Sequence, residues 1–301
     1  MLQVIRRIYR SIVPQDVRRN RALQQWEIRK EKLRNEVLRY YESRYDELNL
    51  ELRAAVDFLR TNPLGVFPSS FAAKYHSESV DVLFDDVCEL RYVMCNGYKL
   101  YYKRGWSEAR IRDYHNGLLQ EQDIESPHRY LTNAFDVSSD DVVTDVGAAE
   151  GIFALSIIDR VKQVYMFETD EGWLEALRET FKPFGDKAVI IHQAVSDRND
   201  ANHTTLDSFF ENKQLDFIKM DVDGGERAAL RGASRLLSTN ASLRVALCAY
   251  HNQQDEEEFT QLLQQHNFKV EAANGYMIFY FDKTLAPPYF RRGVLRATKK
   301  S

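Results

Sequence analysis

The feature that most constrains this chain is the stretch from Val142 to Gly151, which reads VVTDVGAAEG. An apolar run ends at an acidic residue, Asp145, and enters a loop of small residues before a helical pattern begins at Ile152. A buried strand, a tight turn and a helix N-terminus are the expected result. In an open α/β sheet, such a turn is where a nucleotide-like ligand binds.

Two loop patterns can be compared with this stretch. It is a poor match to the dinucleotide pattern GxGxxG and a good match to DxGxGxG, which is typical of S-adenosylmethionine sites, with alanine in the middle glycine position. A carboxylate at the strand end would repel a pyrophosphate, but it would favour an ammonium and a sulfonium. The alternative is that the aspartate only caps the turn. S-adenosylmethionine is therefore the predicted cofactor, and its predicted contacts in the loop are Asp145, Gly147, Ala148, Ala149, Glu150 and Gly151.

The second half of the chain alternates between strand and helix patterns, which indicates a parallel sheet built from βαβ units. The predicted strands are Asp141–Val146, Gln163–Glu168, Ala188–Gln193, Leu215–Asp221 and Leu243–Tyr250. Two more, Asn267–Ala272 and Tyr276–Phe281, flank an Asn-Gly pair and predict an antiparallel hairpin. An α/β fold with a parallel sheet and a terminal antiparallel hairpin is the Rossmann-like sheet of class I methyltransferases. A dinucleotide-binding domain would instead have six parallel strands.

The first 125 residues have a different pattern. Apolar residues at helical spacing from Leu23 to Leu59 predict a long helix or two consecutive ones, with a break around Tyr41–Tyr45. A hairpin is predicted around Asn96-Gly97, a helix over Trp106–Leu119, and another helix opening at Pro127. Three parts are predicted. Residues 1–125 form a helical region with a β-hairpin that caps the acceptor site or forms oligomers. Residues 126–283 form the cofactor-binding methyltransferase domain, and residues 284–301 form a loosely held basic tail.

Composition narrows the function classes. The 301 residues carry a formal net charge of -4, which does not indicate a nucleic-acid partner. The three cysteines form no CxxC pair, so neither a disulfide framework nor a zinc cluster is predicted, in keeping with a reducing compartment. No apolar run approaches the roughly 20 residues needed to span a bilayer, and arginines interrupt the N-terminal segment where a signal peptide would be apolar. A cytoplasmic location is expected.

Charge is concentrated at the N-terminus. Residues 1–39 contain eleven cations and four anions, and apolar residues from Val4 to Ile12 lie at helical spacing among arginines. A basic amphipathic helix of this kind can bind peripherally to an anionic membrane surface, or it can pack on the body of the protein. The longer apolar stripe that follows can pair two chains in a homodimer or pack against the chain's own catalytic domain. Packing within the chain is favoured.

Further predicted cofactor residues follow the second and third strands. Glu168 stands 23 residues after Asp145, a spacing at which an acidic side chain accepts hydrogen bonds from ribose hydroxyls, and Thr169 is next to it. After the third strand, Gln193 and the backbone of Ala194 are placed to contact the adenine edge.

Acidic residues also cluster after the fourth strand. Asp221, Asp223 and Glu226 lie at the edge where ligands bind in open α/β sheets, and His251 follows the fifth strand. Asp223 and Glu226 also have the spacing of a helix capping box, which is the structural alternative. Asp221, Asp223 and His251 are the predicted catalytic residues, because a hydroxyl acceptor must lose its proton as the methyl group arrives. The same groups could bind a divalent cation, which is left undecided.

These motifs, in order and spacing, resemble the FkbM family of S-adenosylmethionine-dependent methyltransferases over roughly residues 126–283. The matching segments are Asp145–Gly151, Phe167–Asp170, Thr205–Phe210, Phe217–Glu226, Leu230–Ala233 and Ala249–His251. The resemblance implies an O-methyltransferase of sugars, glycoconjugates or similar small molecules, with Asp145–Gly151, Glu168 and Asp221 on the cofactor side. His128 and Tyr130 are predicted to line the acceptor site. The family usually has Glu where Asp223 stands and a small residue other than Gly at Gly225.

Three competing functions are left open. A nicotinamide-dependent oxidoreductase could use a similar sheet, although Asp145 and the terminal hairpin argue against it. A non-catalytic assembly protein could bind the cofactor without turnover. A methyltransferase acting on protein or nucleic acid has only the basic N-terminal stretch in its favour.

Overall fold

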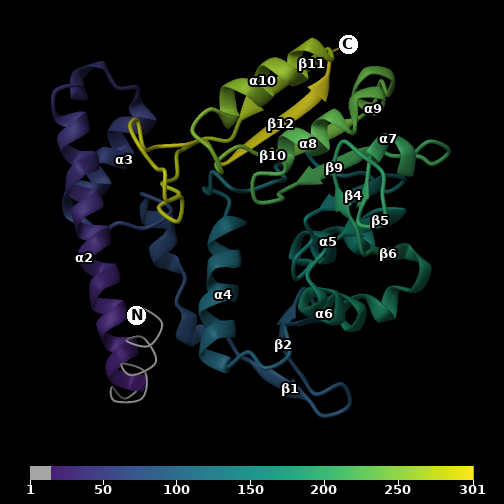
Figure 1. Ribbon diagram of the computed structural model, residues 1–301, viewed down its shortest axis with the longest axis horizontal. Helices are drawn as coiled ribbons and strands as arrows, with labels where there is room; N and C mark the ends of the chain where they lie inside the picture. Colours follow the sequence, from purple (N-terminus) through teal and green to yellow (C-terminus); the bar gives the residue numbers. More distant parts are fainter. Residues whose placement is uncertain (1–14, 301) are drawn as a thin grey trace, which may run out of the picture. The chain divides into compact units, whose positions relative to one another are not determined.

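The computed structural model describes residues 15–300, which fall into two compact units (Figure 1). The first unit contains residues 15–69 and 278–290, and the second contains residues 70–277 and 291–300. The helix predicted at Val4–Ile12 lies outside the described residues. Over the described part of the chain, no helix combines the length and the apolar character that crossing a membrane would require.

The first unit is a helix pair with a returning segment. Helix α2 (Gln15–Glu42) is followed by the short helix η1 (Tyr45–Glu47) and by α3 (Leu50–Thr61), so the chain breaks where the apolar pattern predicts. Asn49 caps α3 by accepting the Leu52 amide at 2.9 Å, and the Arg34 side chain donates to the carbonyl of Leu59 across the pair at 2.6 Å. The later segment joins this unit through the rings of Trp26 and Phe281, whose centroids are 6.0 Å apart.

The second unit begins with two short helices, η2 (Ser70–Lys74) and η3 (Ser77–Ser79), and a small antiparallel sheet of β1 (Leu83–Asp85), β2 (Leu90–Cys95) and β3 (Tyr98–Tyr101). Helix α4 (Glu108–Glu121) follows, capped by Ser107, whose hydroxyl accepts the Arg110 amide at 3.3 Å. The small sheet is bonded to the main domain, since the Tyr101 amide donates to Thr180 at 3.0 Å. The small sheet and α4 thus belong to the same compact unit as the main sheet.

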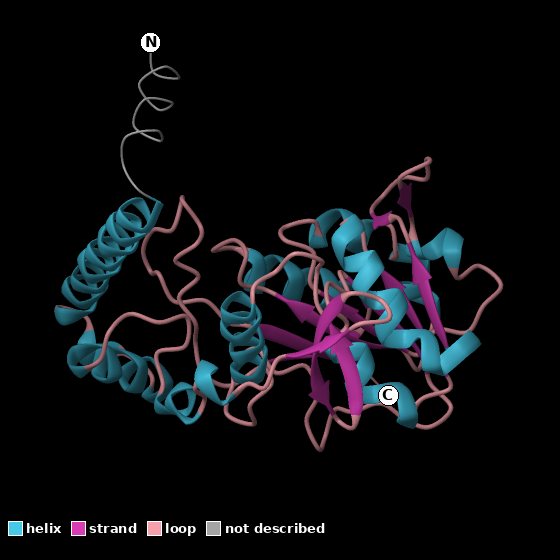
Figure 2. Cartoon of the chain, turned by 90° about the horizontal axis from the view of Figure 1, so that it is seen from below, coloured by secondary structure: helices cyan, strands magenta, loops and turns pink. Residues whose placement is uncertain are grey.

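The main sheet has seven strands in the order β11-β12-β10-β9-β4-β5-β6. Helices lie along it in Figure 2. Its strands are β4 (Val142–Val146), β5 (Gln163–Phe167), β6 (Ala188–Ile191), β9 (Phe217–Met220), β10 (Arg244–Cys248), β11 (Phe268–Ala272) and β12 (Val294–Lys299). Its helices are α5 (Ile152–Ile157), η4 (Ile158–Arg160), α6 (Glu171–Phe181), η5 (Lys182–Lys187), α7 (Leu206–Phe209), α8 (Glu226–Arg231), α9 (Ser234–Thr239) and α10 (Asp255–Gln265).

The central strands are parallel and buried, as their apolar runs predict. Every residue of β4 and β9 is buried, because helices cover both faces of a parallel sheet. All five predicted parallel strands form, and the class I methyltransferase fold is confirmed. Only β12 runs antiparallel, between β10 and β11. This arrangement differs from the six parallel strands of a dinucleotide-binding domain.

The prediction of the second strand of the terminal hairpin was wrong. Tyr276–Phe281 is not a strand; part of it belongs to the first unit, where the Ile278 amide donates to the Val66 carbonyl at 2.9 Å. The partner of β11 is β12, inside the segment predicted to be a loose tail. Val294, Leu295 and Ala297 are buried there, and the Lys299 ammonium donates to the carbonyl of His266 at 2.7 Å. Scattered basic residues hid this strand pattern in the sequence.

The helix predicted to open at Pro127 does not form. The chain makes a turn there instead, in which the Arg129 amide donates to the Ser126 carbonyl at 3.2 Å, and it passes the start of β12: the Val294 amide donates to the Pro127 carbonyl at 3.0 Å. The two segments approach so closely at Gly293 that a Cβ atom added there would lie 2.2 Å from that carbonyl oxygen. This crossing carries the next residues, His128 and Tyr130, to the carboxyl ends of the sheet strands.

Replacing Leu295 by Ala tests whether β12 is structural. Leu295 is 1% exposed and lies on β12 between β10 and β11. The cavity that the smaller alanine side chain leaves should lower the free energy of unfolding by about 2–5 kcal/mol. Urea unfolding measures this, with exposed Lys300→Ala as the control. A loosely held tail would instead leave both variants as stable as the wild type.

Candidate active site at the carboxyl ends of the strands

The loop after β4 has a strained, closely packed backbone. Gly147, Ala149 and Gly151 all have positive φ, at 77°, 47° and 85°. A Cβ atom on Gly147 would lie 1.9 Å from the backbone oxygen of Asp221, so only glycine fits at that crossing of β4 and β9. The left-handed conformation of Ala149 explains why a glycine is usual in the middle position of the pattern. The loop therefore has the open, side-chain-poor backbone that a close-lying cofactor needs.

Asp145 is paired within the protein rather than exposed to a ligand. Its side chain is fully buried, and the ammonium of Lys219 on β9 lies 2.8 Å from its Oδ1 atom. The same ammonium donates to the Gly147 carbonyl at 2.7 Å. Burial raises the pKa of Asp145 while Lys219 opposes that shift; burial alone would lower the pKa of Lys219, but Asp145 and Asp221 raise it. The positive charge of a bound cofactor would therefore meet a carboxylate that Lys219 already neutralises.

Glu168 joins the end of β5 to the loop. One carboxylate oxygen accepts the amides of Thr169 and Asp170 at 2.6 and 2.7 Å, and the other accepts the amide of Ala149 at 2.8 Å. An ionised carboxylate has about four acceptor positions, so one remains for a ribose hydroxyl. Thr169 itself is exposed. The remaining acceptor position of the carboxylate fits the ribose role predicted for Glu168.

The residues predicted at the adenine edge are arranged differently from expectation. Ala194 lies in β7 (Ala194–Val195), which pairs with β8 (His203–Thr204). Its amide donates to the Asn202 carbonyl at 2.8 Å and is not available to an adenine. The Gln193 side chain makes a 3.4 Å contact with the Asp200 carbonyl and is partly exposed.

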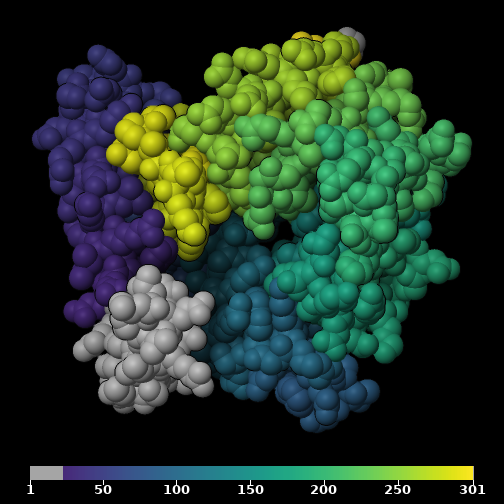
Figure 3. Space-filling model, viewed as in Figure 1, coloured from purple at the N-terminus to yellow at the C-terminus, as the bar shows by residue number. Residues whose placement is uncertain are grey.

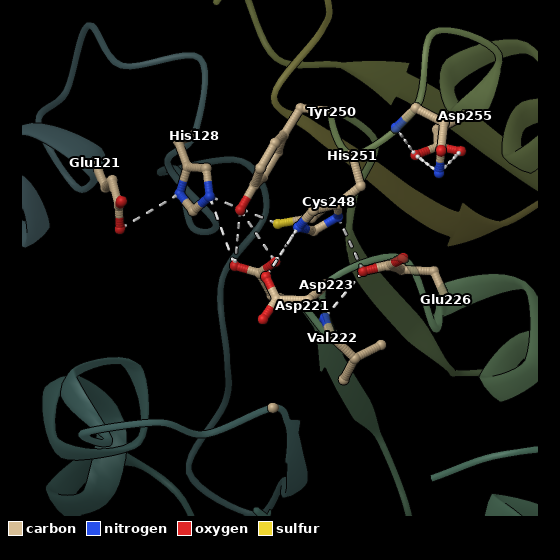
Figure 4. A network of polar contacts seen from close by, with 12 residues as sticks. Glu121, His128, Asp221, Val222, Asp223, Glu226, Cys248, Tyr250, His251 and Asp255 are labelled. Atoms are coloured by element: carbon tan, nitrogen blue, oxygen red, sulfur yellow. Dashed lines mark hydrogen bonds and ion pairs between the residues drawn. The ribbon is translucent and has the colours of Figure 1, made fainter. Parts of the chain in front are cut away.

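Asp221 is the centre of the polar network in Figure 4. It follows β9, and its side chain is 20% exposed. Tyr130 donates to its Oδ2 atom at 3.0 Å and Tyr250 donates to its Oδ1 atom at 3.2 Å. Burial acts to raise the pKa of Asp221, but the charges of Lys219 and His251 and the hydrogen bond from Tyr130 hold that pKa below its usual value. Asp221 is therefore an ionised carboxylate.

His251 lies on one side of Asp221, between carboxylates. Its Nε2 atom is 3.5 Å from Asp221 and 3.6 Å from Asp223, and its Nδ1 atom is 3.1 Å from Glu226. Burial acts to lower the pKa of His251, but Asp223 and Glu226 raise it to about 10. At neutral pH it is an imidazolium, which can neutralise its neighbours but cannot accept a proton.

The capping-box alternative for Asp223 is wrong. Helix α8 starts at Glu226 with Gly225 in the cap position, whereas Asp223 is fully exposed in a left-handed conformation at φ 48°. Glu226 is fully buried and accepts the Val222 amide at 2.9 Å. The turn after β10 is held by buried Arg291, which donates to the carbonyls of Tyr250 and His251 at 2.8 Å each.

His128 lies on the other side of Asp221 and differs from His251 in charge. Its Nε2 atom is 3.7 Å from both Asp221 Oδ2 and Cys248 Sγ, and its Nδ1 atom is 3.9 Å from Glu121. Burial lowers the pKa of His128 to about 4, so its imidazole is neutral. The partly buried position of Glu121 beside Asp221 and Glu150 raises its pKa to about 8.

Sequence reasoning missed several residues of this site. Lys219 and Cys248 were read as ordinary strand residues, and Tyr250 as part of the strand end. No side chain of helix α4 was singled out in the sequence, yet Tyr114 donates to Glu150 at 2.8 Å and Glu121 faces His128. Their spacing of seven residues, two helical turns, was a signal that both lie on one face. The space-filling view shows a hollow between the blue surface that includes α4 and the teal and yellow-green surfaces of the main domain (Figure 3).

Two trios of ligand-type atoms occur among the described residues of this site. They are His128, Asp221 and Cys248, and Asp221, Glu226 and His251, each with its ligand atoms within 4.8 Å of one another.

The comparisons with known proteins agree with this fold. Residues 185–270 match the family model of the methyltransferase FkbM domain, which confirms the predicted resemblance. No curated protein matches the sequence.

Three solved structures are similar over part of the chain. Methyltransferase FkbM from Methylobacillus flagellatus KT is 18% identical, with a TM-score of 0.45, over 63% of this chain and 53% of its own. The chain thus spans about half the length of that relative. Precorrin-6y C5,15-methyltransferase from Geobacter metallireducens GS-15 is 15% identical, with a TM-score of 0.39, over 55% and 82%. A putative methyltransferase from Streptococcus mutans in complex with SAH is 13% identical, with a TM-score of 0.36, over 55% and 91%.

Replacing Lys219 by Met should leave a buried, unpaired carboxylate and lower the free energy of unfolding at pH 7 by about 3–5 kcal/mol. Without Lys219 the pKa of Asp145 in the folded state lies further above its unfolded value of about 3.9. Stability of the variant should therefore be highest near pH 4 and fall as the pH rises through the folded pKa.

Urea unfolding from pH 4 to pH 8 measures this effect. The double variant Lys219→Met with Asp145→Asn, which has no charge to bury, should regain much of the loss at pH 7 and show a flatter pH profile. A single variant as stable as the wild type at pH 7 would contradict the role given to the pair.

Proposed function

Starting from an FkbM-type methyltransferase domain, we propose that this chain transfers the methyl group of S-adenosylmethionine to a hydroxyl of a sugar, a glycoconjugate or a similar small molecule. The observation that carries the proposal is Asp221: an ionised carboxylate, partly open to solvent, at the end of β9 beside the cofactor-type loop. The chain's similarity to FkbM methyltransferases supports the reaction class.

The residues fit a cofactor that carries positive charge. Glu168 has one acceptor position left for a ribose hydroxyl, Glu150 is 4% exposed beside the loop, and Lys219, the cation next to Gly147, is already paired with Asp145. When bound, S-adenosylmethionine supplies an electrophilic methyl group on a sulfonium. The pyrophosphate of a dinucleotide would be repelled by these carboxylates, and the residues described around the loop offer no free cation to neutralise it. This disfavours the oxidoreductase alternative.

The side chains around Asp221 divide the remaining work. Asp221 orients the acceptor hydroxyl and accepts its proton as the new bond forms. His251, as an imidazolium held by Glu226, keeps Asp221 ionised but does not act as the base. Buried His128 and Tyr130, both predicted on the acceptor side, narrow the space around the carboxylate and limit its contact with water.

The predictions on partners and location stay predictions. They are peripheral membrane contact through the basic N-terminus, a homodimer, the absence of a nucleic-acid partner and a cytoplasmic location.

Calorimetry and transfer assays test this proposal together. The purified chain should bind S-adenosylhomocysteine and not NAD, and labelled S-adenosylmethionine should label a carbohydrate or small-molecule fraction of cell material. Asp221→Asn should lower transfer by about 100-fold or more. Its effect on S-adenosylhomocysteine affinity should be much smaller.

Asp81→Asn, an exposed aspartate of the same unit, is the matched control and should transfer normally. Binding of NAD in place of S-adenosylhomocysteine would reject the proposal. Cofactor binding with no transfer to any fraction, unaffected by Asp221→Asn, would favour a non-catalytic assembly protein.

A further inference from the structure

We propose that His128, Asp221 and Cys248 form a binding site for a single divalent transition-metal ion of the zinc class. The three residues come from separate segments: the turn before β4, the end of β9 and the end of β10. Nothing in their sequence spacing suggests a metal site, because 120 residues separate the histidine from the cysteine.

The distances between the ligand atoms fit a small ion. The Nε2 atom of His128 is 3.7 Å from Cys248 Sγ and 3.7 Å from Asp221 Oδ2, and all three ligand atoms lie within 4.8 Å of one another. In a tetrahedral zinc site, bond lengths of about 2.0–2.3 Å place neighbouring ligand atoms about 3.5 Å apart. Three protein ligands leave a fourth position for water or a substrate oxygen.

The surroundings supply the outer contacts that metal ligands usually have. The second ring nitrogen of a metal-bound histidine commonly faces a carboxylate. Here the buried Nδ1 atom of His128 has no hydrogen-bond partner among the described residues, and Glu121 lies 3.9 Å from it. The ligand Asp221 is oriented in turn by the hydroxyls of Tyr130 and Tyr250.

Existing contacts separate this trio from the second one. In the trio of Asp221, Glu226 and His251, both ring nitrogens of His251 already face carboxylates, with Nε2 3.5 Å from Asp221 and Nδ1 3.1 Å from Glu226. On the other side the Nε2 atom of His128 faces the thiol of fully buried Cys248 and one oxygen of Asp221. A divalent ion would neutralise Asp221 and the thiolate that forms when Cys248 releases its proton to solvent.

The donor set selects the kind of metal. Thiolate and imidazole favour Zn²⁺ and related transition metals, whereas Mg²⁺ and Ca²⁺ prefer oxygen ligands alone. An ion bound here would lie beside Asp221, where it could polarise an acceptor hydroxyl. The inference does not depend on the methyl-transfer proposal, since metal binding can be measured without cofactor or acceptor.

Cobalt titration of the chelator-treated full chain is the test. Co²⁺ should bind with a stoichiometry of one and produce the near-ultraviolet thiolate-to-cobalt absorption band, and Zn²⁺ should displace it. Cys248→Ser should remove the band, and Glu121→Gln should weaken binding by about 10-fold while keeping the band. Cys95→Ser, a half-buried cysteine on β2, is the matched control and should behave as the wild type.

The outcomes separate the alternatives. Absence of Co²⁺ and Zn²⁺ binding to a chain that still binds S-adenosylhomocysteine overturns the metal site and leaves the methyltransferase proposal intact. A band that persists in Cys248→Ser also overturns it. Binding lost in His251→Gln but kept in Cys248→Ser assigns the ion to the other trio. Circular dichroism of each variant confirms that it is folded.

Discussion

The buried ion pair between Lys219 and Asp145 is the interaction on which the rest of the site depends. Both side chains leave water, so the pair contributes little stability by itself, but removing either partner alone leaves an uncompensated charge. The ammonium also binds the Gly147 carbonyl, which ties the middle of β9 to the end of β4 and to the start of the loop. The close approach of Gly147 to the Asp221 backbone depends on this alignment.

Asp221 then stands between two histidines of opposite character. His251 carries a proton because three carboxylates surround it, whereas His128 is neutral because it is buried with only one acidic side chain behind its far nitrogen. The two oxygens of Asp221 are divided accordingly: Oδ1 faces the imidazolium and Oδ2 faces the neutral ring. One side of the carboxylate is thus neutralised within the protein, and the other is available to a ligand.

Local patterns were sufficient for the parallel strands and the loop, because a buried strand needs a continuous apolar run and the turn needs small residues. They failed for β12, where the buried residues Val294, Leu295 and Ala297 lie among basic residues whose side chains bind backbone carbonyls. They also failed for Cys248 and Lys219, whose roles arise only when distant strands pair. The charge of His251 could not be predicted either, since it depends on the turn that brings Glu226 within 3.1 Å.

Several residues around the Asp221 network come from outside the segment that matches the FkbM model. Tyr114 and Glu121 on one face of α4 contact Glu150 and His128, and all four precede residue 185, where the match begins. The matched segment contributes Asp221 and the residues after β10. If the proposed function holds, the side chains of α4 and of the segment around His128 are the ones that would contact the acceptor.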